Sequence, residues 1–143
     1  MSRYLGMHIQ RGQLDAVETM FTDADIAEGL AVKLKTSDTV VVVSAAGDPV
    51  YGIAGGKRPG VGVAVVRHGK IWAAADDAAA PVLGAPAYVT AAGKITSEAG
   101  GADSAPANTL VGYFTSDEVA TNGVQNVPTF SNAVKAVQIF VDL

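Results

Sequence analysis

The chain has no cysteine, few charged residues and few aromatic ones. Without cysteine, neither a disulfide nor a thiolate metal site can hold the fold together, which is typical of a protein made in a reducing cytosol. Charged residues make up 17% of the sequence, and the formal net charge of −4 gives nucleic acid or an anionic membrane no electrostatic reason to bind. No apolar run approaches the ~18 residues of a transmembrane helix, and the N-terminus has no signal-peptide core. We therefore expect one soluble protein without nucleic-acid or membrane partners.

The sequence also lacks an arrangement that would support catalysis or hold a cofactor. Residues 52–57 carry glycines before a lysine, but the spacing is too short for a phosphate-binding loop and a strand, not a helix, is expected to follow. His8 and His68 have no partner at metal-ligand spacing, and the acidic pair at 76–77 lacks the other residues of a calcium loop. No nucleophile elbow occurs. We expect no enzyme, no cofactor and no metal.

Glycine, alanine and valine dominate what is present, and this composition favours strands joined by turns. Two segments, 60–73 and 86–96, each consist of two apolar runs separated by a glycine, and both continue into the same Gly-Lys-Ile. Glycine provides the positive φ that a tight turn needs, so each segment is predicted to be a β-hairpin, with turns at His68-Gly69 and Ala92-Gly93. The pattern predicts an all-β fold, either a small β-barrel or a jelly-roll-like sandwich.

Further apolar runs predict strands elsewhere along the chain. The run at 39–43 is apolar on both faces and is expected in the middle of a sheet, whereas the last strand, 134–142, is expected at an edge. The basic stretch at 55–60 is expected to be a loop, and 116–133 a long surface excursion. The remaining predicted strands lie at 30–35, 50–54 and 109–115.

Residues 1–23 differ from the rest because they show neither strand nor helix periodicity yet carry apolar side chains. We interpret them as an extended N-terminal arm that lies on a partner, and 24–143 as the β-domain. Removing residues 1–22 is then expected to leave the β-domain folded. The candidate partner contacts in the arm are Arg3, Met7, Ile9, Arg11, Leu14, Val17, Met20 and Phe21.

The nine aromatic residues leave one alternative open. Trp72 is expected in the core because its large apolar area is usually buried. Exposed rings at Tyr51, Trp72 and Tyr88 on one face would instead favour a small β-sheet module that binds a ligand or carbohydrate.

In their order along the chain, several motifs resemble the capsid cement (decoration) proteins of tailed bacteriophages. The resemblance covers roughly residues 24–143, and each motif alone is short, so its weight comes from the order. The motifs are ADIAEGLAVKL at 24–34, VYGIA at 50–54, GVGVAV at 60–65 with GKIWA at 69–73, GAPAYVT at 84–90 with GKIT at 93–96, and NTLVGYF at 108–114.

The resemblance implies a structural virion protein on the capsid exterior, assembled in the host cytoplasm, which clamps neighbouring major capsid subunits and stabilises the shell. It implies the major capsid protein as a partner and no catalytic residues. The chain differs from the shortest family members in its arm and in the 116–133 excursion, and both are candidates for capsid contacts. Self-association is also expected: pairing of the terminal strand, 134–142, across a two-fold axis favours a dimer, with a trimer as the alternative.

Overall fold

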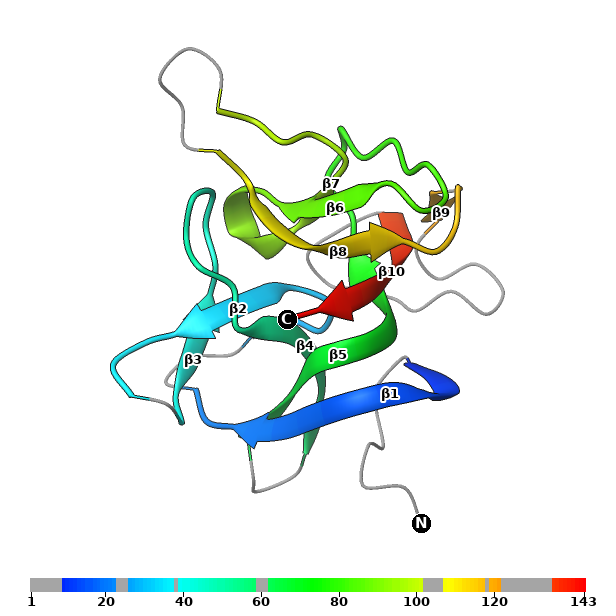
Figure 1. Ribbon diagram of the computed structural model, residues 1–143. Helices are drawn as coiled ribbons and strands as arrows, with labels where there is room; N and C mark the ends of the chain where they lie inside the picture. The colour runs from blue at the N-terminus through cyan, green and yellow to red at the C-terminus, as the bar shows by residue number, and fades with distance from the viewer. Residues whose placement is uncertain are drawn as a thin grey trace.

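A computed structural model describes residues 9–22, 26–37, 39–58, 62–101, 107–117, 119–121 and 135–143. Within these ranges the regular structure is strand apart from one short 3-10 turn, η1 (Ala91–Gly93), so the predicted all-β fold is confirmed (Figure 1). The strands are β1 (Ile9–Met20), β2 (Ala31–Leu34), β3 (Val41–Val43), β4 (Gly52–Arg58), β5 (Gly62–Ala74), β6 (Pro86–Val89), β7 (Ile95–Thr96), β8 (Thr109–Phe114), β9 (Ala120–Thr121) and β10 (Lys135–Asp142).

The strands form one antiparallel sheet in the order β3-β2-β4-β5-β10-β8-β6-β7, with β1 added to β5 and β9 added to β10. The long β5 is the central element of this sheet. Its first half pairs with β4 and its second half with β10, while β1 pairs along the other edge. Figure 1 shows this arrangement, with β1 beneath β5 and β10 above it.

The predicted turn at His68-Gly69 is wrong, because β5 continues through it as one strand of 13 residues. On β1, Val17 pairs with Val66 and Ala16 with His68, so Arg67 is left without a partner in this ladder. The extra residue is a β-bulge, which bends the strand where it changes partner from β4 to β10. Gly69, with φ 131°, therefore accommodates a bend inside a strand and not a hairpin turn.

The second predicted hairpin is confirmed. Strands β6 and β7 pair antiparallel, with Tyr88 opposite Thr96. The turn between them is η1, in which Ala92 and Gly93 have φ values of 62° and 72°. Here the local turn chemistry alone determines the structure.

Two strands lie at other places in the sheet than the sequence predicts. The apolar run at 39–43 was expected to be central, but β3 is at the end of the strand order and pairs with β2. The last strand was expected at an edge, but β10 lies between β5 and β8. Its backbone N–H and C=O groups are therefore paired with strands on both sides. The predicted dimerisation through a free edge of this strand has no basis. Strand β4 also extends to Arg58, into the expected loop at 55–60.

Much of the expected N-terminal arm is part of the sheet. Residues 9–20 form β1, which pairs with β5 from Ile9 to Met20 with several register shifts. Met20 is 3% exposed and packs in an apolar cluster with Ile26, Val32 and Val41. The alternation of apolar and polar residues that is typical of a strand is not visible in the sequence of β1, because the register shifts interrupt it. The separate domain boundary near residue 23 stays a prediction.

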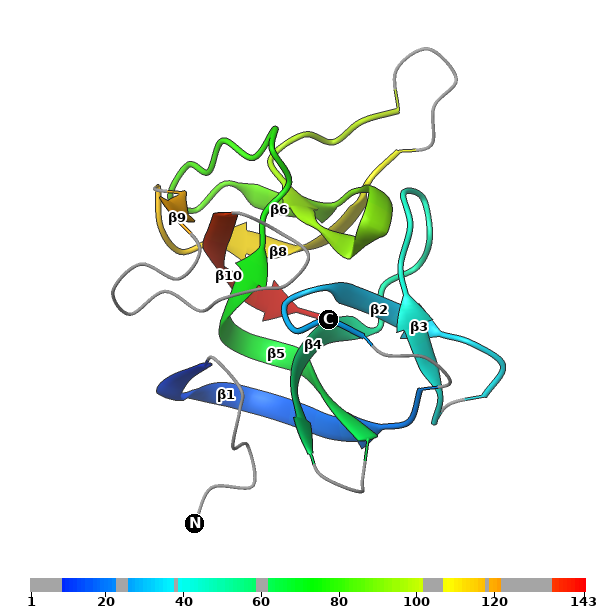
Figure 2. The ribbon, with the colours of Figure 1, turned by 180° about the vertical axis from the view of Figure 1, so that it is seen from behind.

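The main core lies inside the curl of the sheet and is built from Val, Ile and Ala with a single fully buried Phe, Phe114. The curl closes where β7 returns to the end of β5: Ile95 forms a parallel bridge with Ala75, and the Asp76 N–H donates to the Ile95 carbonyl at 2.8 Å. Seen from behind, the turn after β6 lies next to β2 and β3 (Figure 2). Gly93 is required there, since a Cβ would lie 2.8 Å from the Ala31 carbonyl oxygen.

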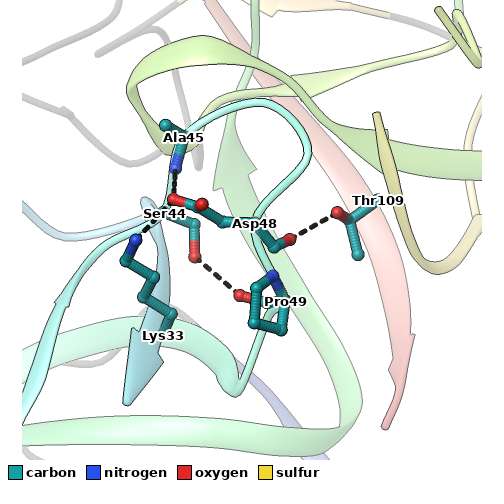
Figure 3. A network of polar contacts seen from close by, with 6 residues as sticks. All are labelled: Lys33, Ser44, Ala45, Asp48, Pro49 and Thr109. Carbon is teal, nitrogen blue, oxygen red and sulfur yellow. Dashed lines mark hydrogen bonds and ion pairs between the residues drawn. The ribbon is translucent and has the colours of Figure 1, made fainter. Parts of the chain in front are cut away.

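A polar network joins the turn after β3 to β8 (Figure 3). Asp48 accepts hydrogen bonds from Lys33 Nζ at 2.7 Å and from the Ala45 N–H at 2.9 Å. The Lys33 ammonium holds the pKa of the Asp48 carboxyl below its usual value. Thr109 Oγ1 donates to the Asp48 carbonyl, so a hydrogen bond across the curl ties β8 to the turn after β3.

Candidate functional site

The aromatic side chains that the structure describes lie mostly outside the core. Among the described aromatic residues, Phe114 is fully buried, whereas Tyr113 is 41% exposed. Small and medium side chains fill the space within the sheet, so the rings are not needed there. The half-buried aromatic residues are Tyr51, Trp72, Tyr88 and Phe140.

Strand alternation places several of these rings on the outside of the curl. Phe140 lies between Ile139 and Val141, both of which are fully buried in the core, so Phe140 points outward. Its ring stacks on Tyr113 of the neighbouring β8, with centroids 5.3 Å apart and an interplanar angle of 10°. Tyr113 in turn lies opposite Pro86 of β6.

A second apolar pair continues the surface along β8. Leu110 is 56% exposed and lies opposite Tyr88 of β6. Leu110 and Tyr113 both face outward although they are three residues apart, because the pairing of β6 with β8 shifts register between Ala87 and Tyr88.

The bulge in β5 connects this surface to β4 and β1. The His68 ring meets Phe140 edge-on, with centroids 4.9 Å apart, and its Nε2 lies 3.2 Å from Asp142. The neighbouring Arg67 places its guanidinium 4.1 Å from the Tyr51 ring centroid, and its Nε donates to the Tyr51 carbonyl at 3.0 Å.

Tyr51 joins the surface to β1. Its hydroxyl donates to Glu18, and this hydrogen bond raises the pKa of the Tyr51 hydroxyl. We call the whole surface the outer face. It consists of Tyr51, Arg67, His68, Pro86, Leu110, Tyr113 and Phe140.

The outer face has the composition of a protein interface. Tyr, Phe and Arg are the residue types enriched where proteins bind one another, and Tyr and Arg contribute much of the binding free energy. The described residues contain no group of three or more His, Cys, Asp and Glu side chains that could hold a metal ion. The arrangement provides contact area and hydrogen-bond donors.

Among the contact residues predicted in the arm, the structure describes the side chains of Val17, Met20 and Phe21. Arg3 and Met7 lie outside the described residues, and Ile9, Arg11 and Leu14 are described through the backbone of β1. Val17 packs against the main core and Met20 is buried, so Met20 is unavailable to a partner. Phe21 is 55% exposed at the end of β1, and its role as a contact stays a prediction.

The rings proposed for a ligand-binding module do not form an open platform. Tyr51, Trp72 and Tyr88 are each half-buried. The Tyr51 ring is covered on one side by Arg67, and Trp72 packs beside Leu30, Ala74 and Ala136 at a small secondary core cluster. Trp72 was predicted to lie in the core, but its half-buried side chain lies at the margin of the core.

Sequence reasoning missed the outer face, although part of its signal is local. Tyr113 precedes a buried Phe114, and Phe140 sits between buried residues. Each strand alone therefore suggests an outward ring. That the two rings stack follows only from the pairing of β8 with β10, which are far apart in sequence.

The comparisons with known proteins point to a virus particle. The family model described as the XM1 gp53 minor capsid protein matches residues 6–139, nearly the whole chain, including β1 and every residue of the outer face except Phe140. No curated protein matches the chain. A helix long and apolar enough to cross a membrane is absent from the described part of the chain.

Proposed function

The chain belongs to the XM1 gp53 minor capsid protein family, and from this premise we propose that it is a cement protein of the capsid. Membership makes it a structural protein of a phage virion that associates with the capsid. The proposal adds three points: it binds the exterior of the shell, its partner is the major capsid protein, and it clamps neighbouring subunits.

The single observation that supports this role best is the outer face. A protein that places rings such as Tyr113 and Phe140 on the outside of its sheet, and packs its core mainly with Val, Ile and Ala, presents contact area to a partner. Many copies held on one lattice convert modest individual contacts into a large total stabilisation, because neighbouring attachments act together. Clamping requires a rigid body, and the bridge between β7 and the end of β5 supports this requirement because it braces the curl of the sheet.

Self-association remains part of the proposal, with a dimer favoured and a trimer as the alternative. Since the backbone of β10 is paired on both sides, the contact between copies cannot be strand pairing through 134–142. Candidates are the expected excursion at 116–133, of which 118 and 122–133 lie outside the described residues, and the exposed Phe21.

Co-sedimentation with expanded, empty shells tests the proposed function. We expect the purified protein to pellet with such shells, to saturate at a fixed number of copies per major capsid subunit, and to raise the temperature at which the shells fall apart. Unexpanded shells and free major capsid subunits serve as controls, because a clamp needs two subunits in their final arrangement. Absence of saturable binding to expanded shells would overturn the proposal.

A further inference from the structure

Arg67 is held in a fixed position by Tyr51. Its side chain is immobilised by two contacts to Tyr51, the stacking at 4.1 Å and the Nε hydrogen bond at 3.0 Å. An arginine has five N–H donors, and Nε accounts for one of them. Among the described residues no ion pair joins Arg67 to a carboxylate. A fixed guanidinium of this kind suits recognition of a carboxylate, since little side-chain entropy is lost on binding.

Apolar contact area lies on the same outer face. Leu110 and Tyr113 are 56% and 41% exposed, and Pro86 is exposed beside Tyr113. The stacking of Tyr113 on Phe140 orients its ring before any partner arrives, which lowers the entropic cost of association.

From these contacts we infer that the outer face is the surface that binds the shell, and that the major capsid subunit supplies a carboxylate to Arg67 and apolar side chains to Leu110 and Tyr113. This inference rests on the proposed capsid-binding function and gives it a location.

The charges near the outer face favour a different protein over a second copy as the occupant. The carboxylates close to the outer face are Glu18 and Asp142, and each already has a partner there, the Tyr51 hydroxyl and His68 respectively. A second copy packed face to face would have to break one of these contacts to reach Arg67. A partner with a carboxylate of its own would not.

Substitutions on the outer face test the inference in the same sedimentation assay. We expect Leu110→Asp to weaken shell binding at least about tenfold, since it places a charge in a desolvated contact. Arg67→Gln is expected to weaken binding about threefold to tenfold and to reduce its dependence on salt concentration. The matched control is Leu34→Asp, because Leu34 is 38% exposed on β2, a strand that contributes no residue to the outer face. The control should bind as the unmodified protein does.

The outcomes distinguish a wrong location of the binding surface from a wrong proposed function. Equal binding by Leu110→Asp, Arg67→Gln and the unmodified protein would overturn the inference and leave the proposed function intact. Failure of the unmodified protein itself to bind would overturn both. If Leu110→Asp turned an oligomer of the free protein into a monomer without changing shell binding, a second copy would cover the outer face, and the inference would be wrong. A photo-crosslinker at position 113 should label the major capsid subunit, and labelling of the protein's own copies alone would contradict it.

Discussion

Glu28 is half-buried in the segment that leads into β2, next to Gly29, which hydrogen-bonds to both β4 and β5. Burial raises the pKa of its carboxyl group from 4.5 to about 7. Between pH 4.5 and about pH 7, the Glu28 carboxyl group is ionised in the unfolded chain but keeps its proton in the folded protein. Raising the pH through this window therefore favours unfolding, and the contribution of Glu28 is fully lost above about pH 7.

The Glu28→Gln variant should remove this pH dependence. We expect the melting temperature of the unmodified protein to fall more steeply between pH 5 and pH 8 than that of the variant, which cannot ionise at this position. Thermal unfolding followed by circular dichroism measures both. The two proteins share all other acidic groups, so parallel curves of melting temperature against pH would contradict the raised pKa of Glu28.

Gly112 of β8 lies opposite Val141 of β10. A Cβ at this position would be 1.8 Å from the carbonyl oxygen of Phe140, which is backbone and cannot move aside without breaking the ladder. We expect Gly112→Ala to lower the free energy of unfolding by about 2–4 kcal/mol. Gly84→Ala is the control, since nothing lies within 4 Å of its Cβ position, and its positive φ alone should cost about 1 kcal/mol. Equal urea midpoints for the two variants would show that β8 and β10 are not packed this closely.

At the scale of the element, the N-terminal segment belongs to the folded domain only if β1 is a strand of the sheet. Met20 and Phe21 are neighbours with opposite environments, 3% and 55% exposed. If β1 is a strand of the sheet, Met20→Ala should cost about 2–4 kcal/mol of unfolding free energy, because it leaves a cavity, and Phe21→Ala less than about 1 kcal/mol.

Chemical denaturation of the two variants distinguishes the strand from a detached arm. A detached arm would make both substitutions neutral in the free protein. For the same reason, removal of residues 1–22 should now unfold or strongly destabilise the protein, contrary to what the sequence suggests.

Elements whose structure depends on nearby residues could be predicted, and those that depend on distant pairing could not. The β6–β7 hairpin follows from its own turn, in which Ala92 and Gly93 adopt positive φ. Gly69 offers the same signal, but pairing with β1, β4 and β10 on both edges keeps β5 extended through it. Likewise, an apolar strand such as β10 does not reveal whether its neighbours lie on one side or both. The candidate site follows this rule, since its rings come from strands that are far apart in sequence.

At the scale of the whole molecule, contacts across the curl show how a lightly charged chain without disulfides can form the rigid body that the proposed clamp requires. The Ala75–Ile95 bridge links β7 to the end of β5, and the hydrogen bond from Thr109 to Asp48 links β8 to the turn after β3, so force applied at the outer face would be distributed over several strands. Each copy then needs only a modest contact, since attachment at many lattice sites stabilises the shell collectively.

Electron cryo-microscopy of expanded shells saturated with the protein tests the central claim most directly. The account predicts density for the curled sheet on the exterior of the shell, at fixed lattice positions that span the seam between neighbouring major capsid subunits. It further predicts that β6, β8 and β10 face the shell. Density on the interior, density confined within a single subunit, or shells without ordered additional density would contradict the claim that this protein is a cement.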